Sequence, residues 1–297
     1  MSAPAPDAPL LAVEALSAAA GRDGRPILRG VSLTIGRGEV HGLVGESGAG
    51  KSTIAKAILG ILPAGVALTG GRMAFEGEDL VGMAARRRAE ILGRDITLIP
   101  QDPLTSLNPG RRIAAQLTDG LRLKRGLGRA EARRRALELL DEVMIRDPER
   151  VMRAYPHELS GGMRQRVLIA SAFAVEPKLV VADEPTTALD VTVQKEILRL
   201  VRTLQARHGT GVVFVTHDLG VVAKICDRVT LLYMGKVIEQ GTTAALIEAP
   251  RHAYTRALVA ASPRTDRPDA GLAPVPDAVF SDLRREIADF DRSRTHG

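Results

Sequence analysis

Aromatic residues are scarce in this sequence, and tryptophan is absent. Only 3% of the 297 residues are Phe, Trp or Tyr, which argues against an aromatic platform for stacking single-stranded bases. Basic residues outnumber acidic ones by 41 to 35, and many of them are arginines in short clusters such as residues 86–88. We interpret these clusters as solvated helix faces, so nucleic acid is not an expected partner.

Cysteine is almost absent as well, with Cys226 as the single example. One thiol excludes an intramolecular disulfide and any site built from several cysteines, such as an iron–sulfur cluster. Cys226 lies beside a strand-like run, so we expect a small packed core residue rather than a reactive thiol. Cysteine poverty is typical of proteins in a reducing cytoplasm.

Long hydrophobic runs are also missing. No stretch approaches the roughly 20 apolar residues that a membrane-spanning helix needs. The apolar stretch at residues 10–20 follows no Lys or Arg and is interrupted by Glu14, so it lacks the features of a secretory signal. We therefore expect a soluble protein that reaches a membrane only through partners.

Several short runs of apolar, often β-branched residues lack the polar alternation of a half-exposed strand. Such runs predict strands that are buried on both faces, as in a largely parallel sheet covered by helices. The runs are residues 40–44, 96–99, 179–182, 212–215 and 229–232. Helical patterns at residues 51–62 and 191–208 alternate with them, which predicts a doubly wound α/β core.

Between residues 102 and 175 the pattern indicates helices and loops without a convincing strand. A charged helix is predicted at residues 130–144, with Leu137, Leu140 and Met144 along its apolar stripe. We interpret residues 102–175 as a helical subdomain inserted into the α/β core of a domain that covers residues 1–252. Residues 253–297 then form a C-terminal extension, with one short helix and a loosely ordered tail from Ser262 onward.

A glycine-rich segment gives the first indication of chemistry. It follows the strand at residues 40–44 and opens the next helix, which is the context that a nucleotide phosphate-binding loop requires. Glycines let backbone N–H groups turn toward a phosphate, and the helix N-terminus adds its positive end. Lys51 is expected to reach the β- and γ-phosphates, and Ser52 to offer its hydroxyl to Mg²⁺. The predicted nucleotide-binding residues here are Gly45, Glu46, Ser47, Gly48, Ala49, Gly50, Lys51, Ser52 and Thr53.

Two acids, Asp183 and Glu184, end the predicted strand at residues 179–182. Carboxylates at the carboxyl end of a strand face the ligand crevice of an open α/β sheet. Asp183 is suited to hold Mg²⁺ through water, and Glu184 is suited to polarise the water that attacks the γ-phosphorus.

A second anion site is predicted at Ser160, Gly161 and Gly162. Ser160 can cap a helix that runs through residues 167–174, and the two glycines leave the first amides uncovered. Leu159 and these three residues resemble the signature of the ABC ATPase family, and the resemblance extends over about residues 8–262. It implies a P-loop NTPase core of ABC type, in which the signature of one subunit closes over the γ-phosphate held by another. ATP would then be hydrolysed in a head-to-tail dimer.

The same resemblance covers three further residues. Gln101 matches a glutamine that joins Mg²⁺ to the helical region, Asp190 lies in a loop that crosses the dimer, and His217 matches a histidine that contacts the γ-phosphate. It thus implies catalytic roles for Glu184, His217 and Gln101. The implied Mg²⁺ ligands are Ser52, Gln101 and Asp183.

One departure from the family concerns the base. Family members usually carry an aromatic residue about 25 positions before the phosphate loop, whereas residues 16–21 of this chain contain no ring. Stacking on such a ring is worth ~1–3 kcal/mol per base. We expect either weak discrimination between ATP and GTP or a neighbouring residue that takes over the contact.

Finer features resemble the subfamily of oligopeptide, dipeptide and nickel importers. They lie in residues 101–109, 185–194 and 250–258, and the pattern at Met163 and Thr186 resembles the first of the two ATPase subunits in these systems. The implied partners are transmembrane permease subunits, a second ATPase subunit that is either different or identical, and, indirectly, an extracytoplasmic substrate-binding protein. The implied location is the cytoplasmic face of the cell membrane.

Peptides are the cargo that this resemblance favours. A nickel or other small-solute importer is one alternative, and a soluble accessory ATPase of phosphonate breakdown is another.

Overall fold

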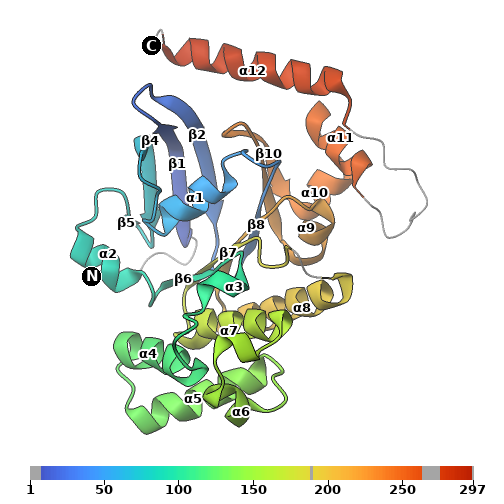
Figure 1. The fold of residues 1–297 in the computed structure, drawn as a ribbon. Coiled ribbons are helices and arrows are strands. Elements are labelled where there is room, and N and C mark those ends of the chain that lie inside the picture. Colours follow the sequence, from blue (N-terminus) through green and yellow to red (C-terminus); the bar gives the residue numbers. More distant parts are fainter. Residues whose placement is uncertain (1–7, 188–189, 263–274, 296–297) are drawn as a thin grey trace. The chain divides into compact units, whose positions relative to one another are not determined.

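A computed structural model of the chain describes residues 8–187, 190–262 and 275–295 (Figure 1). The chain divides into two compact units. The first comprises Met1–Ile35, Glu39–Val81 and Phe214–Gly297, and the second comprises Gly36–Gly38 and Gly82–Val213. The boundary that we predicted at residue 252 falls inside the first unit and stays a prediction about sequence organisation.

A four-stranded antiparallel sheet in the first unit was not predicted from the sequence. Its strands, in the order β2-β1-β4-β5, are β1 (Leu11–Ala20), β2 (Arg25–Ile35), β4 (Val66–Phe75) and β5 (Glu78–Asp79). The pairing of β1 with β2 shifts register between Val13 and Leu16, where Ala15 has a φ of 48°. Such a bulge interrupts the period-two alternation of a strand, which explains why the pattern was missed.

The predicted buried strands form the second sheet. They are β3 (Val40–Val44), β6 (Ile96–Ile99), β7 (Leu179–Asp183), β8 (Gly211–Thr216) and β9 (Arg228–Tyr233), with β10 (Lys236–Thr242) as an added edge strand. The strand order is β10-β9-β3-β8 in the first unit and β8-β7-β6 in the second, because the residues of β8 are divided between the two. Every residue of β3 and β8 is buried, as expected for strands without polar alternation.

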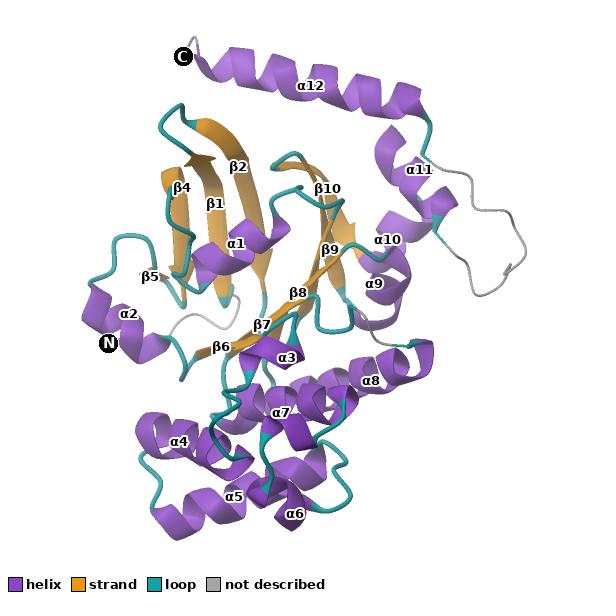
Figure 2. Ribbon diagram, viewed as in Figure 1, coloured by secondary structure: helices purple, strands orange, loops and turns teal. Residues whose placement is uncertain are grey.

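Helices alternate with these strands along the chain. The first unit contains α1 (Lys51–Ile58), α9 (Leu219–Ile225), α10 (Thr243–Glu248), α11 (Ala253–Ala261) and α12 (Asp277–Thr295). The second contains α2 (Ala85–Ile91), α3 (Pro103–Ser106), α4 (Ile113–Arg125), α5 (Arg129–Glu142), α6 (Pro148–Arg153), the 3₁₀ turn η1 (Pro156–Glu158), α7 (Gly161–Ala174) and α8 (Val191–His208). Figure 2 shows helices and loops, with no strand among the described residues, between β6 and β7, as predicted for residues 102–175.

Two predicted helices differ from those in the structure. The helix expected at residues 51–62 ends at Ile58, because Gly60 adopts a φ of 65° and Pro63 follows. In α5, Met144 lies beyond the helix and is 57% exposed, so it is not part of the apolar stripe. The residues that α5 buries are Ala132, Ala136, Leu139 and Leu140.

The C-terminal tail also differs from its prediction. We expected loose order from Ser262 onward, but residues 277–295 form the helix α12. Leu283 and Ile287 are 1% and 3% exposed, so this helix packs its apolar face against the first unit. Phe280, Leu283 and Ile287 recur at three- and four-residue spacing, a helical period that the Pro-, Asp- and Arg-rich composition of the tail concealed.

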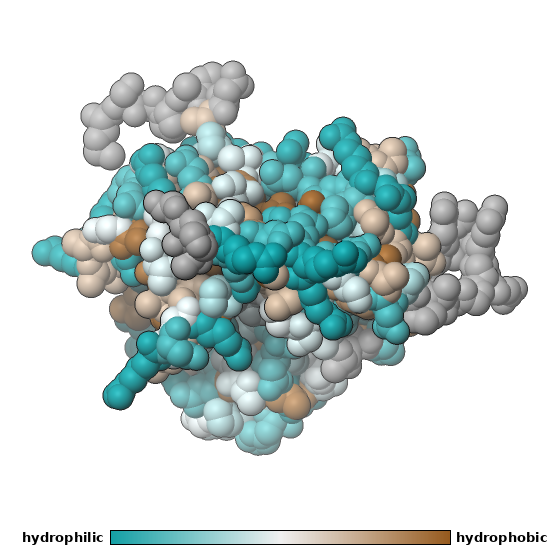
Figure 3. Space-filling model, turned by 90° about the horizontal axis from the view of Figure 1, so that it is seen from above, coloured by the Kyte–Doolittle hydropathy of each residue, from teal (hydrophilic) through white to brown (hydrophobic). Residues whose placement is uncertain are grey.

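Within the described residues, no helix combines the length and the apolar character that crossing a membrane requires. The face shown in Figure 3 is mostly hydrophilic, with apolar residues scattered among polar ones. Cys226, the lone cysteine, is buried as predicted, and its sulfur lies 3.0 Å from where a side chain on Gly42 would begin.

Candidate nucleotide site

The predicted phosphate loop connects β3 to α1 in the first unit. Lys51 is 5% exposed, and its ammonium group donates hydrogen bonds of 2.7 and 2.9 Å to the carbonyls of Gly45 and Glu46. Gly50, which precedes the helix, has a φ of 96° that few other residues adopt. Among the described residues no side chain caps α1. The first amides of α1 and the Lys51 ammonium therefore provide positive charge at one place, as an anion site requires.

Backbone groups support the loop from behind. The amide of Gly235, in the turn between β9 and β10, donates a 3.0 Å hydrogen bond to the Ala49 carbonyl. A Cβ on Gly45 would lie 2.2 Å from the Leu232 carbonyl oxygen, and one on Gly235 would lie 1.9 Å from the Ile27 carbonyl oxygen. The loop, the β9–β10 turn and β2 are thus packed backbone against backbone, which leaves no room for side chains at these glycines.

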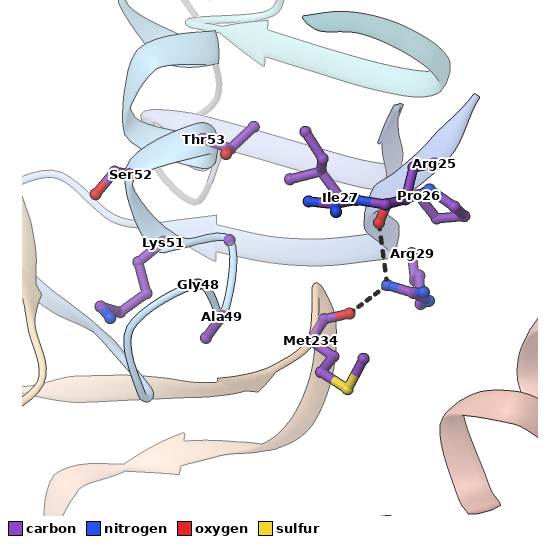
Figure 4. A pocket seen from close by; sticks show the side chains of 11 residues that line it. Arg25, Pro26, Ile27, Arg29, Gly48, Ala49, Lys51, Ser52, Thr53 and Met234 are labelled. Atoms are coloured by element: carbon purple, nitrogen blue, oxygen red, sulfur yellow. Dashed lines mark hydrogen bonds between the residues drawn. The ribbon is translucent and has the colours of Figure 1, made fainter. Parts of the chain in front are cut away.

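A cavity of about 480 Å³ opens beside the loop (Figure 4). Its walls come from the start of β2, from the loop with the first turn of α1, and from the β9–β10 turn. The lining side chains outside the loop are Arg25, Pro26, Ile27, Arg29 and Met234. These residues carry no local signal in the sequence, because they reach the loop only where the Arg29 amide of β2 donates a hydrogen bond to the Gly235 carbonyl in the β9–β10 turn.

The ring-less stretch at residues 16–21 belongs mainly to β1 rather than to this wall. Ala18 is only 1% exposed, so its side chain packs inside the first unit. The wall next to the phosphate loop is formed instead by β2, which offers a guanidinium, a proline ring and an aliphatic side chain.

Behind the loop, Tyr254 of α11 is fully buried. Burial raises the pKa of its phenol above the usual range, and the nearby carboxylate of Glu46 adds to this effect. Its hydroxyl makes no hydrogen bond of normal geometry within the described residues. Glu46 is therefore the loop residue that the C-terminal extension approaches, through a charge effect rather than a formed hydrogen bond.

In the second unit, Glu184 follows the end of β7 directly. Its φ of 46° is rare for a residue with a side chain and indicates backbone strain at this position. Gln101 Nε2 and Thr187 Oγ1 donate hydrogen bonds of 3.2 and 2.9 Å to the same carboxylate oxygen, Oε2. Two donors thus orient a carboxylate that retains lone pairs to accept a proton from water.

A buried amide fixes the segment after Glu184. Gln165 of α7 is 1% exposed, and its Nε2 donates a 2.8 Å hydrogen bond to the Pro185 carbonyl. The helix that begins at the predicted signature is therefore tied to the segment that carries the predicted base. Sequence reasoning gave no signal for Gln165, since a glutamine within a helix has no distinctive pattern.

The predicted signature forms the start of α7. Ser160 is its N-cap, and its hydroxyl accepts a 3.3 Å hydrogen bond from the Met163 amide. A Cβ on Gly161 would meet nothing within 4 Å, so the surface above this helix start is open. The expected cap is present, while contact of Ser160, Gly161 and Gly162 with a phosphate stays a prediction.

Asp190 is the N-cap residue of α8 in the second unit, and His217 directly precedes the N-cap residue of α9 in the first unit. The Asp190 carboxylate caps α8 by accepting hydrogen bonds from Thr192 and Val193 amides, at 3.0 and 2.9 Å. The preceding residues of its predicted loop, 188–189, lie outside the described residues. His217 follows β8 in the first unit and is exposed, next to Asp218, the N-cap of α9. Their roles toward nucleotide stay predictions.

Comparison with known proteins decides the family. The sequence profile of the ABC transporter family matches residues 28–187, more than half of the chain. The chain belongs to this family. A second profile, described as the C-terminal region of oligopeptide/dipeptide transporters, matches residues 238–286 of this ABC protein. Its match ends within α12, the helix that the sequence analysis missed.

Curated relatives are similar over most of the ABC chain. It is 49% identical over 263 residues to a peptidoglycan transport ATP-binding protein of Agrobacterium fabrum, covering 88% of this chain but 48% of that protein. It is 47% identical over 253 residues to a probable D,D-dipeptide transport ATP-binding protein of Escherichia coli, covering 85% of this chain and 77% of that one. The chain is therefore about half the length of the first relative and most of the length of the second.

A solved structure agrees with the fold. An ATP-binding cassette, determined as a dimer in a post-hydrolysis state with ADP and Pi, superposes with a TM-score of 0.69 at 29% identity. The match covers 78% of this chain and 98% of that one. The predicted P-loop core of ABC type is confirmed, and the chain is an ATPase subunit of this type.

Proposed function

We propose that this ABC subunit hydrolyses ATP in the presence of Mg²⁺ to drive the import of di- or oligopeptides through a separate permease. The observation that carries the proposal is the match of residues 238–286 to the C-terminal region of oligopeptide/dipeptide transporters, because this match is separate from residues 28–187, which the general ABC transporter profile covers. The name of the D,D-dipeptide relative supports the same class of cargo.

The residues divide the work of hydrolysis in this proposal. Lys51 and the first amides of α1 hold the β- and γ-phosphates, since charge-assisted hydrogen bonds to phosphate are about twice as strong as neutral ones. Ser52, Asp183 and Gln101 supply oxygen ligands of the kind that Mg²⁺ prefers, and the ion neutralises charge on the phosphate oxygens. Glu184 accepts the proton of the attacking water, oriented by the donors Gln101 and Thr187.

The base is held by β2 in this proposal. Ile27 and Pro26 offer apolar contact, and the flat guanidinium of Arg25 is suited to lie over a purine ring as a cation–π partner. None of these side chains distinguishes the hydrogen-bonding edge of adenine from that of guanine. Discrimination between ATP and GTP is accordingly expected to stay below ~100-fold, equivalent to about 2.7 kcal/mol.

The active form in this proposal is a pair of ATPase subunits. Ser160 and the glycines after it serve the ATP that is held by the other subunit, which requires a head-to-tail arrangement. The dimeric state of the solved cassette supports such a pair. Whether the second subunit is identical or different is decided by purification, and a different one is expected from the subfamily resemblance.

The test is reconstitution with the permease and ATPase subunits encoded beside this one. ATP hydrolysis is measured in proteoliposomes with the substrate-binding protein, either empty or loaded with a defined set of di- and tripeptides. We expect peptide-loaded binding protein to stimulate hydrolysis several-fold, and a complex with Glu184→Gln to show none. If only a nickel-loaded binding protein stimulated hydrolysis, the cargo would be nickel and not peptides. Co-purification with soluble catabolic enzymes alone would favour an accessory ATPase.

A further inference from the structure

Arg29 of β2 is an unusual lining residue, because its guanidinium joins three separate segments of the first unit. Its Nη1 donates hydrogen bonds of 2.5 Å to the Met234 carbonyl and 3.5 Å to the Pro26 carbonyl (Figure 4). Its Nε and Nη2 donate at 2.8 and 2.9 Å to the two carboxylate oxygens of Asp291 on α12. The Arg29 side chain is only 10% exposed, whereas that of Asp291 is 39% exposed.

The two carbonyls that Arg29 holds belong to the walls of the nucleotide pocket. Pro26 belongs to the β2 wall, and Met234 lies in the β9–β10 turn that supports the phosphate loop. The Arg29 amide also donates a 2.8 Å hydrogen bond to the Gly235 carbonyl, so side chain and backbone act on the same turn. Arg29 therefore fixes the distance between the base side of the pocket and the turn behind it.

Asp291 is presented by a helix that is firmly packed. Lys236 of β10 forms a 2.7 Å ion pair with Glu286 and lies 5.2 Å from the centre of the Phe290 ring. Phe280 contacts the rings of Tyr233 and Tyr254, at 6.2 and 6.1 Å between centroids. With the burial of its apolar face, these contacts hold α12 along the whole stretch from residue 280 to residue 291.

From this geometry we propose that Asp291 is a positioning residue for nucleotide binding, which sets the Arg29 guanidinium and through it the base-side wall of the pocket. A bidentate carboxylate fixes the plane of a guanidinium, and with it the direction of the remaining Nη1 donor. The C-terminal helix thereby takes part in binding without touching the ligand. The inference rests on the proposed nucleotide pocket and assigns a task to the helix that ends the chain.

The position of Arg29 predicts which part of the ligand is affected. Arg29 touches the β2 wall and the β9–β10 turn, whereas the phosphates are held by Lys51 and by the first amides of α1. The backbone hydrogen bonds that join Arg29 to Gly235 and Gly235 to Ala49 of the phosphate loop do not involve the guanidinium, so they should remain when its orientation is lost. Binding of a complete nucleotide should therefore weaken, while binding of inorganic triphosphate should stay almost unchanged. This difference separates a positioning role from general damage to the fold.

The experiment compares Asp291→Asn with Asp289→Asn in the full chain. Asp289 is two residues earlier on α12 and is 67% exposed. Within the described residues it pairs with Arg292 of the same helix and with no residue of another element, so it is a matched control. Affinity for ATP and for inorganic triphosphate, both with Mg²⁺, is measured by displacement of a fluorescent nucleotide. Because Asp291 is 39% exposed, we expect a moderate rise in the Kd for ATP, about three- to tenfold, in Asp291→Asn. The Kd for triphosphate should change less than about twofold, and the control should change neither.

A charge swap separates orientation of Arg29 from attachment of α12. The double variant Arg29→Asp with Asp291→Arg restores an ion pair but removes the donor to the Met234 and Pro26 carbonyls. We expect the melting temperature of the double variant to lie closer to wild type than that of Asp291→Asn, while its affinity for ATP stays as weak as in Asp291→Asn. Recovery of ATP affinity in the swap, an equal loss of ATP and triphosphate in Asp291→Asn, or no change in either would each overturn the proposal. If the wild-type chain bound neither ligand, the proposed nucleotide site itself would be wrong.

Discussion

Replacing Glu184 with glutamine removes the negative charge of the proposed base and keeps the length of its side chain. Glutamine has the same length, and its side-chain oxygen can still accept the hydrogen bonds from Gln101 Nε2 and Thr187 Oγ1, which are 3.2 and 2.9 Å long in the wild type. The strained backbone at residue 184 and the Gln165 tie to Pro185 are also unaffected. The change therefore removes mainly the ability to accept a proton from water.

The expected loss follows from that single function. A positioned general base contributes about 10²–10⁴-fold to a rate, which corresponds to ~2.7–5.4 kcal/mol of transition-state stabilisation. The two hydrogen bonds weaken when their acceptor becomes neutral, but both are at the surface, so the free energy of unfolding should change by less than ~1 kcal/mol. The Kd for ATP should stay within about threefold of wild type, since no phosphate contact is assigned to Glu184.

The assay is steady-state phosphate release at saturating ATP, combined with size-exclusion chromatography in ATP and Mg²⁺. The variant should accumulate as a nucleotide-bound dimer, because binding continues while hydrolysis stops. Thr187→Ala, which removes one orienting donor and leaves the carboxylate, serves as the control and should retain far more activity. Hydrolysis by Glu184→Gln within threefold of wild type would refute the assignment of the base.

Three further predictions concern other parts of the chain. Lys51→Ala should raise the Kd for ATP by about 10- to 100-fold in equilibrium titration, because it removes the cation that faces the β- and γ-phosphates; an unchanged Kd would contradict the loop assignment. Ser160→Arg should abolish turnover while ATP titration of the isolated subunit is little changed, because we propose that this serine contacts the nucleotide held by the partner subunit; loss of ATP binding by the monomer would contradict the composite site. Burial lowers the pKa of His208 in the folded chain, so the unfolded chain binds a proton at this imidazole more readily. The free energy of unfolding should therefore decrease as pH falls below about 6.5. Urea unfolding at pH 7.5 and 5.5 should show a smaller loss in His208→Gln than in wild type.

Much of the parallel sheet, and the family to which the chain belongs, were predictable from local pattern. Strands that are buried on both faces have uninterrupted apolar sequences, so the predicted bounds of β3 and β6 agree with the observed ones. The phosphate loop combines a strand, glycines and a lysine at fixed spacing, and this combination is specific. The N-cap role of Ser160 also followed from its place before a helical run.

The parts that were missed depend on contacts between distant segments. β1 carries a bulge at Ala15, and β4 contains Gly70 and Gly71, so neither strand shows regular alternation. The pocket wall at Arg25 and Ile27 exists only because β2 pairs beside the phosphate loop, which no local pattern reveals. In α12 the apolar residues have helical spacing, but the Pro-, Asp- and Arg-rich composition around them is typical of a loosely ordered tail.

The backbone-to-backbone packing around Gly45 affects how glycine invariance in such loops should be interpreted. A side chain at Gly45 would overlap the Leu232 carbonyl even in a protein that never met a nucleotide. Gly48, by contrast, has open space where a Cβ would lie, and its φ of 80° is a conformation that asparagine also tolerates. Persistence of glycine at position 45 among homologues would therefore reflect the packing of the loop against β9 as much as ligand contact. Persistence at position 48 would be better evidence of selection by the phosphate.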